Sequence, residues 1–185
     1  MTIPHDFRFE SCDLATLKPG LPSKLYFDPG AYSAELQRVW NRQWLYVCRS
    51  HALAQPGDYR VIQIDTQSIL VVRDTDASLY AFHNTCRHRG SILCEEVSGH
   101  LPRKRIVCPY HRWSYALSGE LVSVPFLETG GSENCITLYK VAAREWGGNV
   151  FINLDGDAAA EFESSADPGL DVLANWPLAD LRVAH

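Results

Sequence analysis

The sequence predicts a mainly β fold with one helix near the N-terminus and two metal-binding loops at hairpin tips. Short runs rich in β-branched and aromatic residues recur from residue 44 onward, separated by turn residues. Residues 30–44 carry large side chains at steps of three and four, which is typical of a helix. Two short segments, Cys86-Arg87-His88 and Cys108-Pro109-Tyr110-His111, each combine one Cys with one His.

The elements follow in order along the chain. Residues 1–28 are interrupted by prolines and predicted to be irregular, and Asp28-Pro29 is a start signal for the helix over 30–44. Strands are then predicted at 44–48, 59–64, 68–73, 79–82, 105–108, 113–117, 121–124, 137–142 and 149–154. Turn residues at 56–58, 65–67, 74–78 and 118–119 separate them. Both Cys/His segments therefore fall at loops that rigid strands hold in place.

Composition limits the function further. The chain has 185 residues, is 46% hydrophobic and carries a formal net charge of −5, which argues against nonspecific nucleic-acid binding. No apolar run approaches the roughly 18 residues of a membrane helix, and the N-terminus lacks a signal-peptide pattern. The cysteines outside the two segments show no disulfide framework, so we expect small buried side chains in a cytoplasmic protein. They are Cys12, Cys48, Cys94 and Cys135.

Two Cys and two His can hold a [2Fe–2S] cluster in which both His bind the same iron. A Cys and a His two or three residues apart can turn toward one metal centre, and Gly90 and Pro109 are suited to tight loops. The alternative is a structural zinc site of Cys₂His₂ type. Zinc fingers usually keep like ligands together, whereas each segment here is mixed. We therefore predict that Cys86 and Cys108 bind one iron and that His88 and His111 bind the other.

At these residues the chain resembles the Rieske domain of ring-hydroxylating-type oxygenase α-subunits, over roughly residues 20–185. The matching stretches are 82–90 and 108–115, and Arg112 stands where the family usually has Gly or a small residue. The Rieske proteins of cytochrome complexes carry an extra Cys in each loop, which form a disulfide. Ser91 and Tyr110 occupy those positions here, which favours the oxygenase or ferredoxin branch. The resemblance implies an antiparallel β-sandwich and a potential of about −150 mV.

The resemblance also implies a domain organisation and partners. Residues 1–44 would form an N-terminal arm and helix, 45–155 the Rieske domain, and 156–185 a linker, with its most linker-like part at 158–167, leading into a missing catalytic domain. That domain would hold a mononuclear non-haem Fe(II) on two His and one carboxylate. No such His pair follows residue 155, where His185 stands alone, so we assign no catalytic residue to this chain. A ferredoxin or flavin reductase would donate electrons, and the catalytic domain of a neighbouring α-subunit in a trimer-type homo-oligomer would accept them.

Other residues near the two loops have simpler interpretations. His83 precedes Cys86 by three residues, and we predict a strand-end histidine rather than a ligand. A basic region around the loops is either a solvated face or a source of positive potential that docks an acidic donor. It comprises Arg87, Arg89, Arg103, Lys104, Arg105 and Arg112. A free-standing Rieske ferredoxin remains an alternative function, and the sequence does not decide between quaternary amines and aromatic acids as substrates.

Overall fold

The computed structural model describes residues 19–125, 136–156, 162 and 176–182. The chain forms two compact units, Met1–Glu35 and Leu36–His185. Cys12, Cys135, His185 and nearly all of the linker predicted at 158–167 lie outside the described residues. Within the described part of the chain, no helix is long and apolar enough to cross a membrane.

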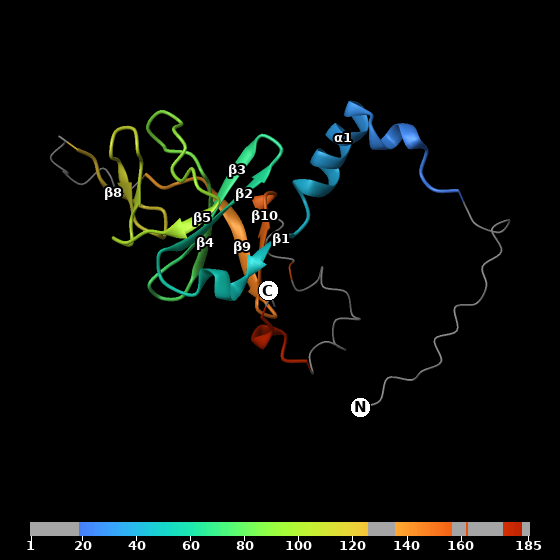
Figure 1. The fold of residues 1–185 in the computed structure, drawn as a ribbon. Coiled ribbons are helices and arrows are strands. Elements are labelled where there is room, and N and C mark those ends of the chain that lie inside the picture. The colour runs from blue at the N-terminus through green and yellow to red at the C-terminus, as the bar shows by residue number, and fades with distance from the viewer. Residues whose placement is uncertain (1–18, 126–135, 157–161, 163–175, 183–185) are drawn as a thin grey trace. The chain divides into compact units, whose positions relative to one another are not determined.

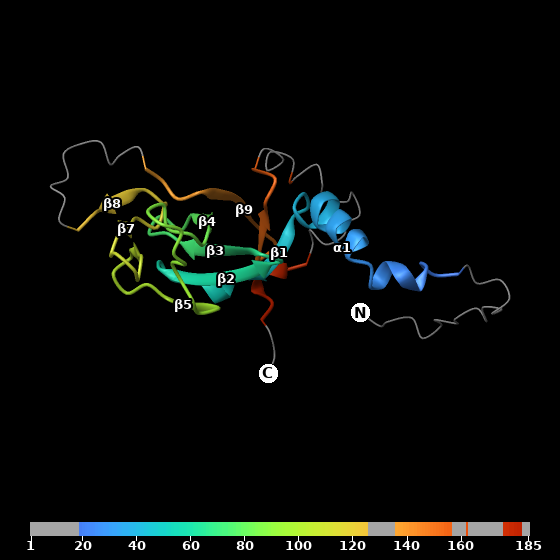
Figure 2. The same cartoon turned by 90° about the horizontal axis from the view of Figure 1, so that it is seen from above.

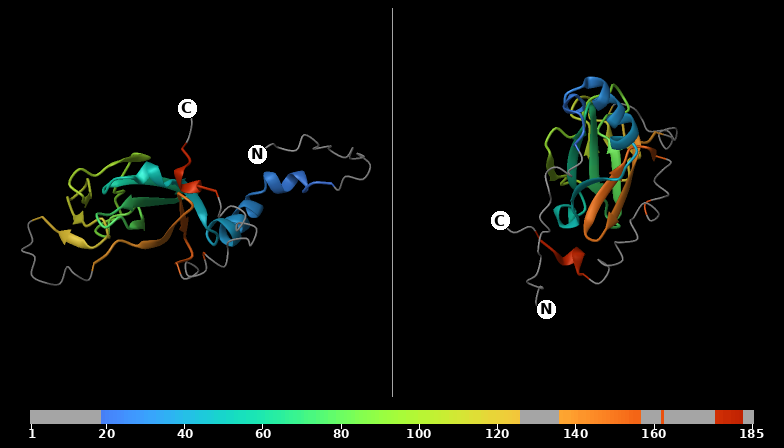
Figure 3. Two further views of the ribbon diagram at one scale, coloured as in Figure 1. Left: turned by 90° about the horizontal axis from the view of Figure 1, so that it is seen from below. Right: turned by 90° about the vertical axis from the view of Figure 1, so that its right-hand side faces the viewer.

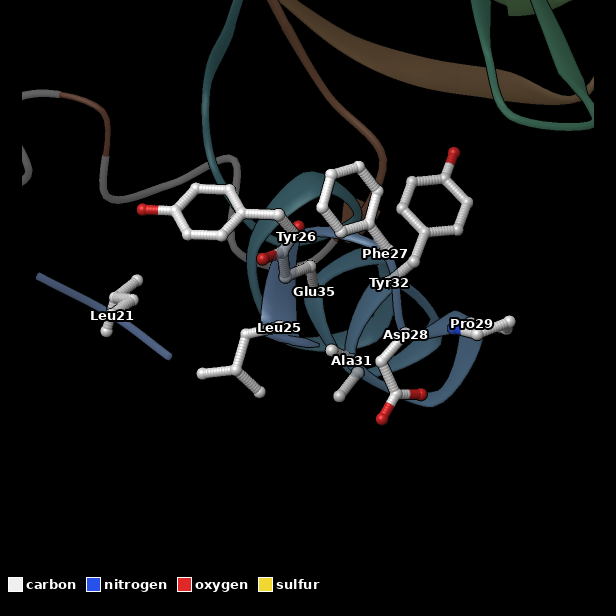
Figure 4. A pocket seen from close by; sticks show the side chains of 10 residues that line it. Leu21, Leu25, Tyr26, Phe27, Asp28, Pro29, Ala31, Tyr32 and Glu35 are labelled. Carbon is white, nitrogen blue, oxygen red and sulfur yellow. The ribbon is translucent and has the colours of Figure 1, made fainter. Parts of the chain in front are cut away.

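The first unit contains two short helices, η2 (Ser23–Tyr26) and α1 (Pro29–Glu35), and neither buries a residue in this described stretch. The Asp28 carboxylate accepts a hydrogen bond from the Gly30 N–H at 2.7 Å, at the predicted helix start. Aromatic and aliphatic side chains border a hollow of about 710 Å³, and Phe27 is 85% exposed (Figure 4). Local hydrogen bonds, rather than a buried core, thus order these helices.

The predicted helix over 30–44 is shorter in the structure. After α1 the chain continues as a π-helical turn, η3 (Leu36–Trp40), in which the Asn41 N–H donates to the Leu36 carbonyl at 2.9 Å. The first strand then begins at Leu45. The polar residues 41–43 form the turn between helix and strand, which the spacing of large side chains alone does not reveal.

The second unit is a mainly antiparallel β structure, as predicted (Figures 1 and 2). One sheet has the strand order β1-β10-β9-β4-β3-β2-β5, and a smaller sheet has the order β6-β7-β8. The strands are β1 (Leu45–Arg49), β2 (Asp58–Ile64), β3 (Gln67–Arg73), β4 (Leu79–His83), β5 (Ser98–His100), β6 (Ile106–Val107), β7 (Ser114–Tyr115), β8 (Leu121–Ser123), β9 (Lys140–Trp146) and β10 (Asn149–Asn153). The described part of this unit also contains the 3₁₀ turns η4 (Ser50–Leu53) and η8 (Leu178–Asp180).

Two hydrophobic cores lie on opposite faces of β3, because side chains alternate along a strand. Ile69 and Val71 join a core with residues of β1, β2, β4, β9 and β10, so the large sheet curls around it. Leu70 and Val72 join the other core, which includes the buried residues of the small sheet and both cysteines of the predicted site. The burial of both faces explains why β3 reads as a continuous apolar run.

Several strands are shorter than predicted, such as β7, which covers two residues of the predicted 113–117, and two strands, β5 and β9, depart further from the prediction. β5 pairs with β2 through Ser98, Gly99 and His100, which are all exposed and give no hydrophobic signal. β9 spans Lys140–Trp146 instead of 137–142. Its C-terminal part contains the exposed polar residues Arg144 and Glu145, which do not show the apolar pattern used to predict strands. These strands show where burial patterns cannot report backbone pairing.

Arg49 ties the last described segment of the chain to the β9–β10 hairpin. Its guanidinium donates to the Gly147 carbonyl at 3.3 Å and to the Asn149 side-chain oxygen at 2.9 Å. It also donates to the carbonyl oxygens of Leu178 and Leu181. The η8 turn, red in Figure 3, is thereby held beside the orange hairpin.

Gly119 is the glycine that the β7–β8 hairpin most depends on. Its φ is +96°, and a Cβ there would lie 2.5 Å from a ring carbon of the buried Phe82. Gly119→Ala should lower the free energy of unfolding by about 2–4 kcal/mol, because it combines left-handed strain with overpacking. Gly156 also has a positive φ but open space around it, so Gly156→Ala should cost only about 1 kcal/mol. Equal losses in urea denaturation would contradict this account.

Candidate metal centre

The first loop, residues 84–94, follows β4 and carries Cys86 and His88. The Cys86 N–H donates to the Ser91 carbonyl at 2.8 Å, and the Gly90 N–H donates back to the Cys86 carbonyl at 3.0 Å. Gly90 has a φ of +72°, which turns the chain back on itself. An isolated bridge between Thr85 and Ile92 closes the loop below this turn.

The second loop, residues 108–113, repeats this backbone pattern. The Cys108 N–H donates to the Trp113 carbonyl at 2.8 Å, and the Arg112 N–H donates to the Cys108 carbonyl at 3.1 Å. Arg112 has a φ of +61°, so a left-handed residue again stands four positions after the cysteine. This conformation explains why glycine suits the position, and an arginine there costs about 1–2 kcal/mol of backbone energy.

The two thiols are brought together inside the protein. Cys86 and Cys108 are each 2% exposed, and each thiol affects the pKa of the other. Burial raises the pKa of Cys86. Burial also acts to raise the pKa of Cys108, but the backbone N–H groups of Tyr110 and His111 help to bring it below its ordinary value. The pair is thus a buried sulfur site with its own hydrogen-bond donors.

The two imidazoles are brought together at the surface end of the same loops. The Nδ1 atoms of His88 and His111 lie 3.1 Å apart. The His88 ring is stacked on the indole of Trp113, with centroids 4.8 Å apart and planes 6° from parallel. The Tyr110 ring lies 3.7 Å from the His111 ring. Aromatic neighbours therefore fix the orientation of both histidines.

Tyr115 links the buried thiols to the first loop. Its hydroxyl accepts a hydrogen bond from the Arg87 N–H at 3.1 Å and lies 3.2 Å from the Cys86 sulfur. Either atom can donate in the free thiol, but a metal-bound thiolate carries no proton, so the hydroxyl is then the donor. Burial and the contact with Cys86 raise the pKa of Tyr115, so the hydroxyl remains a donor. The sequence places Tyr115 in a strand, but its contact with a residue 29 positions away has no local signal.

The donor set forms two separate pairs, one of sulfur and one of nitrogen. Among the described residues, no group of three or more His, Cys, Asp or Glu side chains is arranged to hold a single metal ion. A structural zinc ion needs four such ligands around one centre. Two pairs suit a cluster of two metal ions, each with two protein ligands. The chemistry of these residues therefore fits a two-iron cofactor better than a zinc ion.

The predicted basic region divides into two parts. All six side chains are exposed: Arg87, Arg89 and Arg112 lie on the two loops, and Arg103, Lys104 and Arg105 lie between β5 and β6. Arg87 packs its guanidinium 4.0 Å from the centre of the Tyr139 ring and donates to the Thr137 carbonyl at 3.1 Å. Arg87 thus fastens the first loop to the segment that precedes β9.

The remaining candidates lie apart from the two pairs. His83 ends β4, is half-buried, and borders an open hollow with Thr85, Tyr139 and Lys140; burial lowers its pKa. Cys48 and Cys94 are buried free thiols. Burial raises both pKa values, that of Cys94 to about 11. These two are small core residues, as predicted.

Comparison with known proteins identifies the domain. The sequence model of the Rieske [2Fe-2S] domain family matches residues 43–141. The chain belongs to this family. Its cofactor is a [2Fe–2S] cluster, and the predicted mainly β Rieske fold is confirmed.

The relatives are oxygenase subunits, which confirms the predicted resemblance. The glycine betaine monooxygenase oxygenase subunit of Chromohalobacter salexigens is 34% identical over 89% of this chain and 36% of its own length. The carnitine monooxygenase oxygenase subunit of Escherichia coli K12 is 34% identical over 89% of this chain and 44% of its own.

Solved structures agree with this assignment. The quaternary ammonium Rieske monooxygenase CntA superposes with a TM-score of 0.69 at 28% identity, covering 89% of this chain and 46% of that one. Naphthalene 1,2-dioxygenase superposes with a TM-score of 0.64 at 30% identity, covering 80% of this chain and 32% of that one. The chain thus spans less than half the length of these relatives.

The packing of Arg87 on Tyr139 generates a stability prediction. A double-mutant cycle of Arg87→Gln and Tyr139→Leu should give a coupling energy of about 0.5–1 kcal/mol, as expected for an exposed cation–π pair. Arg89 is an exposed neighbour on the same loop, and Arg89→Gln combined with Tyr139→Leu should be additive. Additivity of the Arg87 pair in urea denaturation would show that the contact contributes nothing.

Proposed function

We propose that Cys86, His88, Cys108 and His111 hold the [2Fe–2S] cluster, with both cysteines on one iron and both histidines on the other. The observation that carries this assignment is the separation of the donors into a buried sulfur pair and a surface nitrogen pair. Because the two Nδ1 atoms face each other, Nδ1 is the atom that each histidine presents to a metal. The Nε2 side of each ring is then left for contacts outside the loops.

We infer that the chain relays single electrons within a Rieske non-haem iron oxygenase. When bound, the cluster accepts and donates one electron at a time. The imidazoles at the surface give electrons a short path to a partner, while the sulfur pair stays shielded from water. The exposed basic side chains favour the extra negative charge of the reduced site and attract an acidic donor. Similarity to oxygenase subunits over 89% of the chain favours this role over a free-standing ferredoxin.

The partners follow from the same proposal. A ferredoxin or flavin reductase supplies electrons, and a mononuclear iron in the catalytic domain of a neighbouring subunit receives them for O₂ activation. The relatives include enzymes named for quaternary amines and for aromatic compounds, such as chlorobenzene dioxygenase of Cupriavidus. We propose that the catalytic domain, rather than the Rieske domain, sets the substrate.

The ligand assignment predicts which substitutions remove the cofactor. The purified protein should contain about two irons and two acid-labile sulfides per chain. Cys86→Ser, Cys108→Ser, His88→Ala and His111→Ala should each abolish visible absorbance and bound iron, since each removes one ligand. His83→Ala is the matched control and should keep its iron. A colourless His83→Ala protein, or iron retained in all four ligand variants, would show that the ligand set is wrong.

The Tyr115 hydroxyl predicts a shift in the reduction potential. A hydrogen bond to a cysteine sulfur stabilises the more negative reduced state. Tyr115→Phe should therefore lower the potential, on the order of 40 mV for a bond of about 1 kcal/mol. Tyr110 is 61% exposed and contacts His111 through its ring, so Tyr110→Phe should leave the potential nearly unchanged. Protein-film voltammetry decides, and equal potentials for both variants would contradict the role of the hydroxyl.

A further inference from the structure

The side chain of Asn84 is buried beneath the first loop and is 1% exposed. Its amide nitrogen donates to the Ser68 hydroxyl at 3.1 Å and to the Cys94 carbonyl at 2.7 Å. Its amide oxygen accepts from the N–H groups of Leu93 and Cys94 at 3.3 and 3.0 Å. These are all four hydrogen bonds that a primary amide can make.

We propose that Asn84 is the positioning residue that fixes Cys86 and His88 for the cluster. This inference rests on the ligand assignment proposed above. The Asn84 amide bonds both the N–H and the carbonyl of Cys94, as a neighbouring strand would. The side chain thereby adds a pair of hydrogen bonds, like those between antiparallel strands, that joins the two ends of the first loop at residues 84 and 94.

Asn84 also joins this base to the large sheet. Its backbone N–H donates to the Ser68 carbonyl at 2.8 Å, and its side chain reaches the Ser68 hydroxyl on the same residue of β3. Above this anchor come the Thr85–Ile92 bridge and the Cys86–Ser91 hydrogen bond. If residues 84 and 94 move, these consecutive backbone contacts should move Cys86 and His88 as well.

The second loop is held differently, which makes the dependence on Asn84 specific to the first. Strands β6 and β7 flank the second loop and pair directly, Ile106 with Tyr115 and Val107 with Ser114. In the first loop the backbone pairing includes the Thr85–Ile92 bridge and a 3.4 Å hydrogen bond from the Leu93 N–H to the Asn84 carbonyl, and the Asn84 side chain extends this pairing to Cys94. Aspartate has the same shape but lacks both donors, and glutamine places its amide one methylene farther away.

Asn153 provides a matched control at the end of β10. It is also 1% exposed, donates to the Arg42 carbonyl at 3.1 Å and accepts from the Asp155 N–H at 2.8 Å. Asn84→Asp and Asn153→Asp thus make the same chemical change to two buried asparagines. The loss of one donated hydrogen bond and the burial of a carboxyl group are common to both proteins, and Asn84→Asp loses a second donated bond, so urea unfolding measures the stability of each.

The test compares wild type, Asn84→Asp and Asn153→Asp by three measurements: iron release to a chelator, the EPR spectrum after reduction, and urea unfolding. We expect Asn84→Asp to release iron on the order of tenfold faster than Asn153→Asp at comparable stability, as the loss of two buried hydrogen bonds implies. Its EPR line shape should also change, because one ligand at each iron has moved. Ser68→Ala removes one of the four bonds and should accelerate iron release by a few-fold, as one hydrogen bond is worth.

Equal iron release and identical EPR spectra in the two Asn→Asp proteins would overturn the inference. If Asn84→Asp does not fold, Ser68→Ala decides, and wild-type behaviour in that variant overturns it. Wild-type protein without iron and sulfide would remove the proposed ligand set and this inference together. A wild type with its cluster and unaffected variants would remove only the role of Asn84.

Discussion

The return turn in each loop is the constraint on which the site depends. A cysteine must reach into the core while a histidine two or three residues later stays at the surface. Both loops meet this demand with the same hydrogen bonds around the cysteine and a left-handed residue four positions after it, Gly90 or Arg112. The core that surrounds Cys86 and Cys108 then joins the small sheet to the large one, so cofactor site and fold are built from the same packing.

The sulfur and nitrogen donors lie at opposite ends of the site, one pair in the core and the other at the surface. The thiols lie in the core, where water is excluded and Tyr115 provides a hydrogen bond. The imidazoles lie at the surface, each held by an aromatic ring. Under the proposed function, electrons therefore pass at the histidine end, and the protein adjusts the potential from the cysteine end. Arg87 serves the architecture through Tyr139, while its exposed basic neighbours remain available for electrostatic attraction.

The sequence predicted those features that depend on local spacing. The two Cys/His segments and strands such as β2 and β3 are legible because ligand spacing and alternating burial are short-range patterns. The contacts that shape the site join residues distant in sequence, as Asn84 does with β3, and no local pattern reports them. The exposed strand β5 was missed because backbone pairing leaves no hydrophobic signal. The positive φ of Arg112 was also not foreseen, although the family preference for a small residue there pointed to it.

The most direct test of the central claim is the number of histidine nitrogens bound to iron. Electron–nuclear double resonance on the reduced protein, grown with ¹⁵N-labelled histidine, reports nitrogens coupled to the cluster. The proposed arrangement predicts two directly bound histidine nitrogens in the wild-type protein, and both should remain in His83→Ala. A spectrum with no directly bound nitrogen would indicate an all-cysteine cluster and would contradict the account.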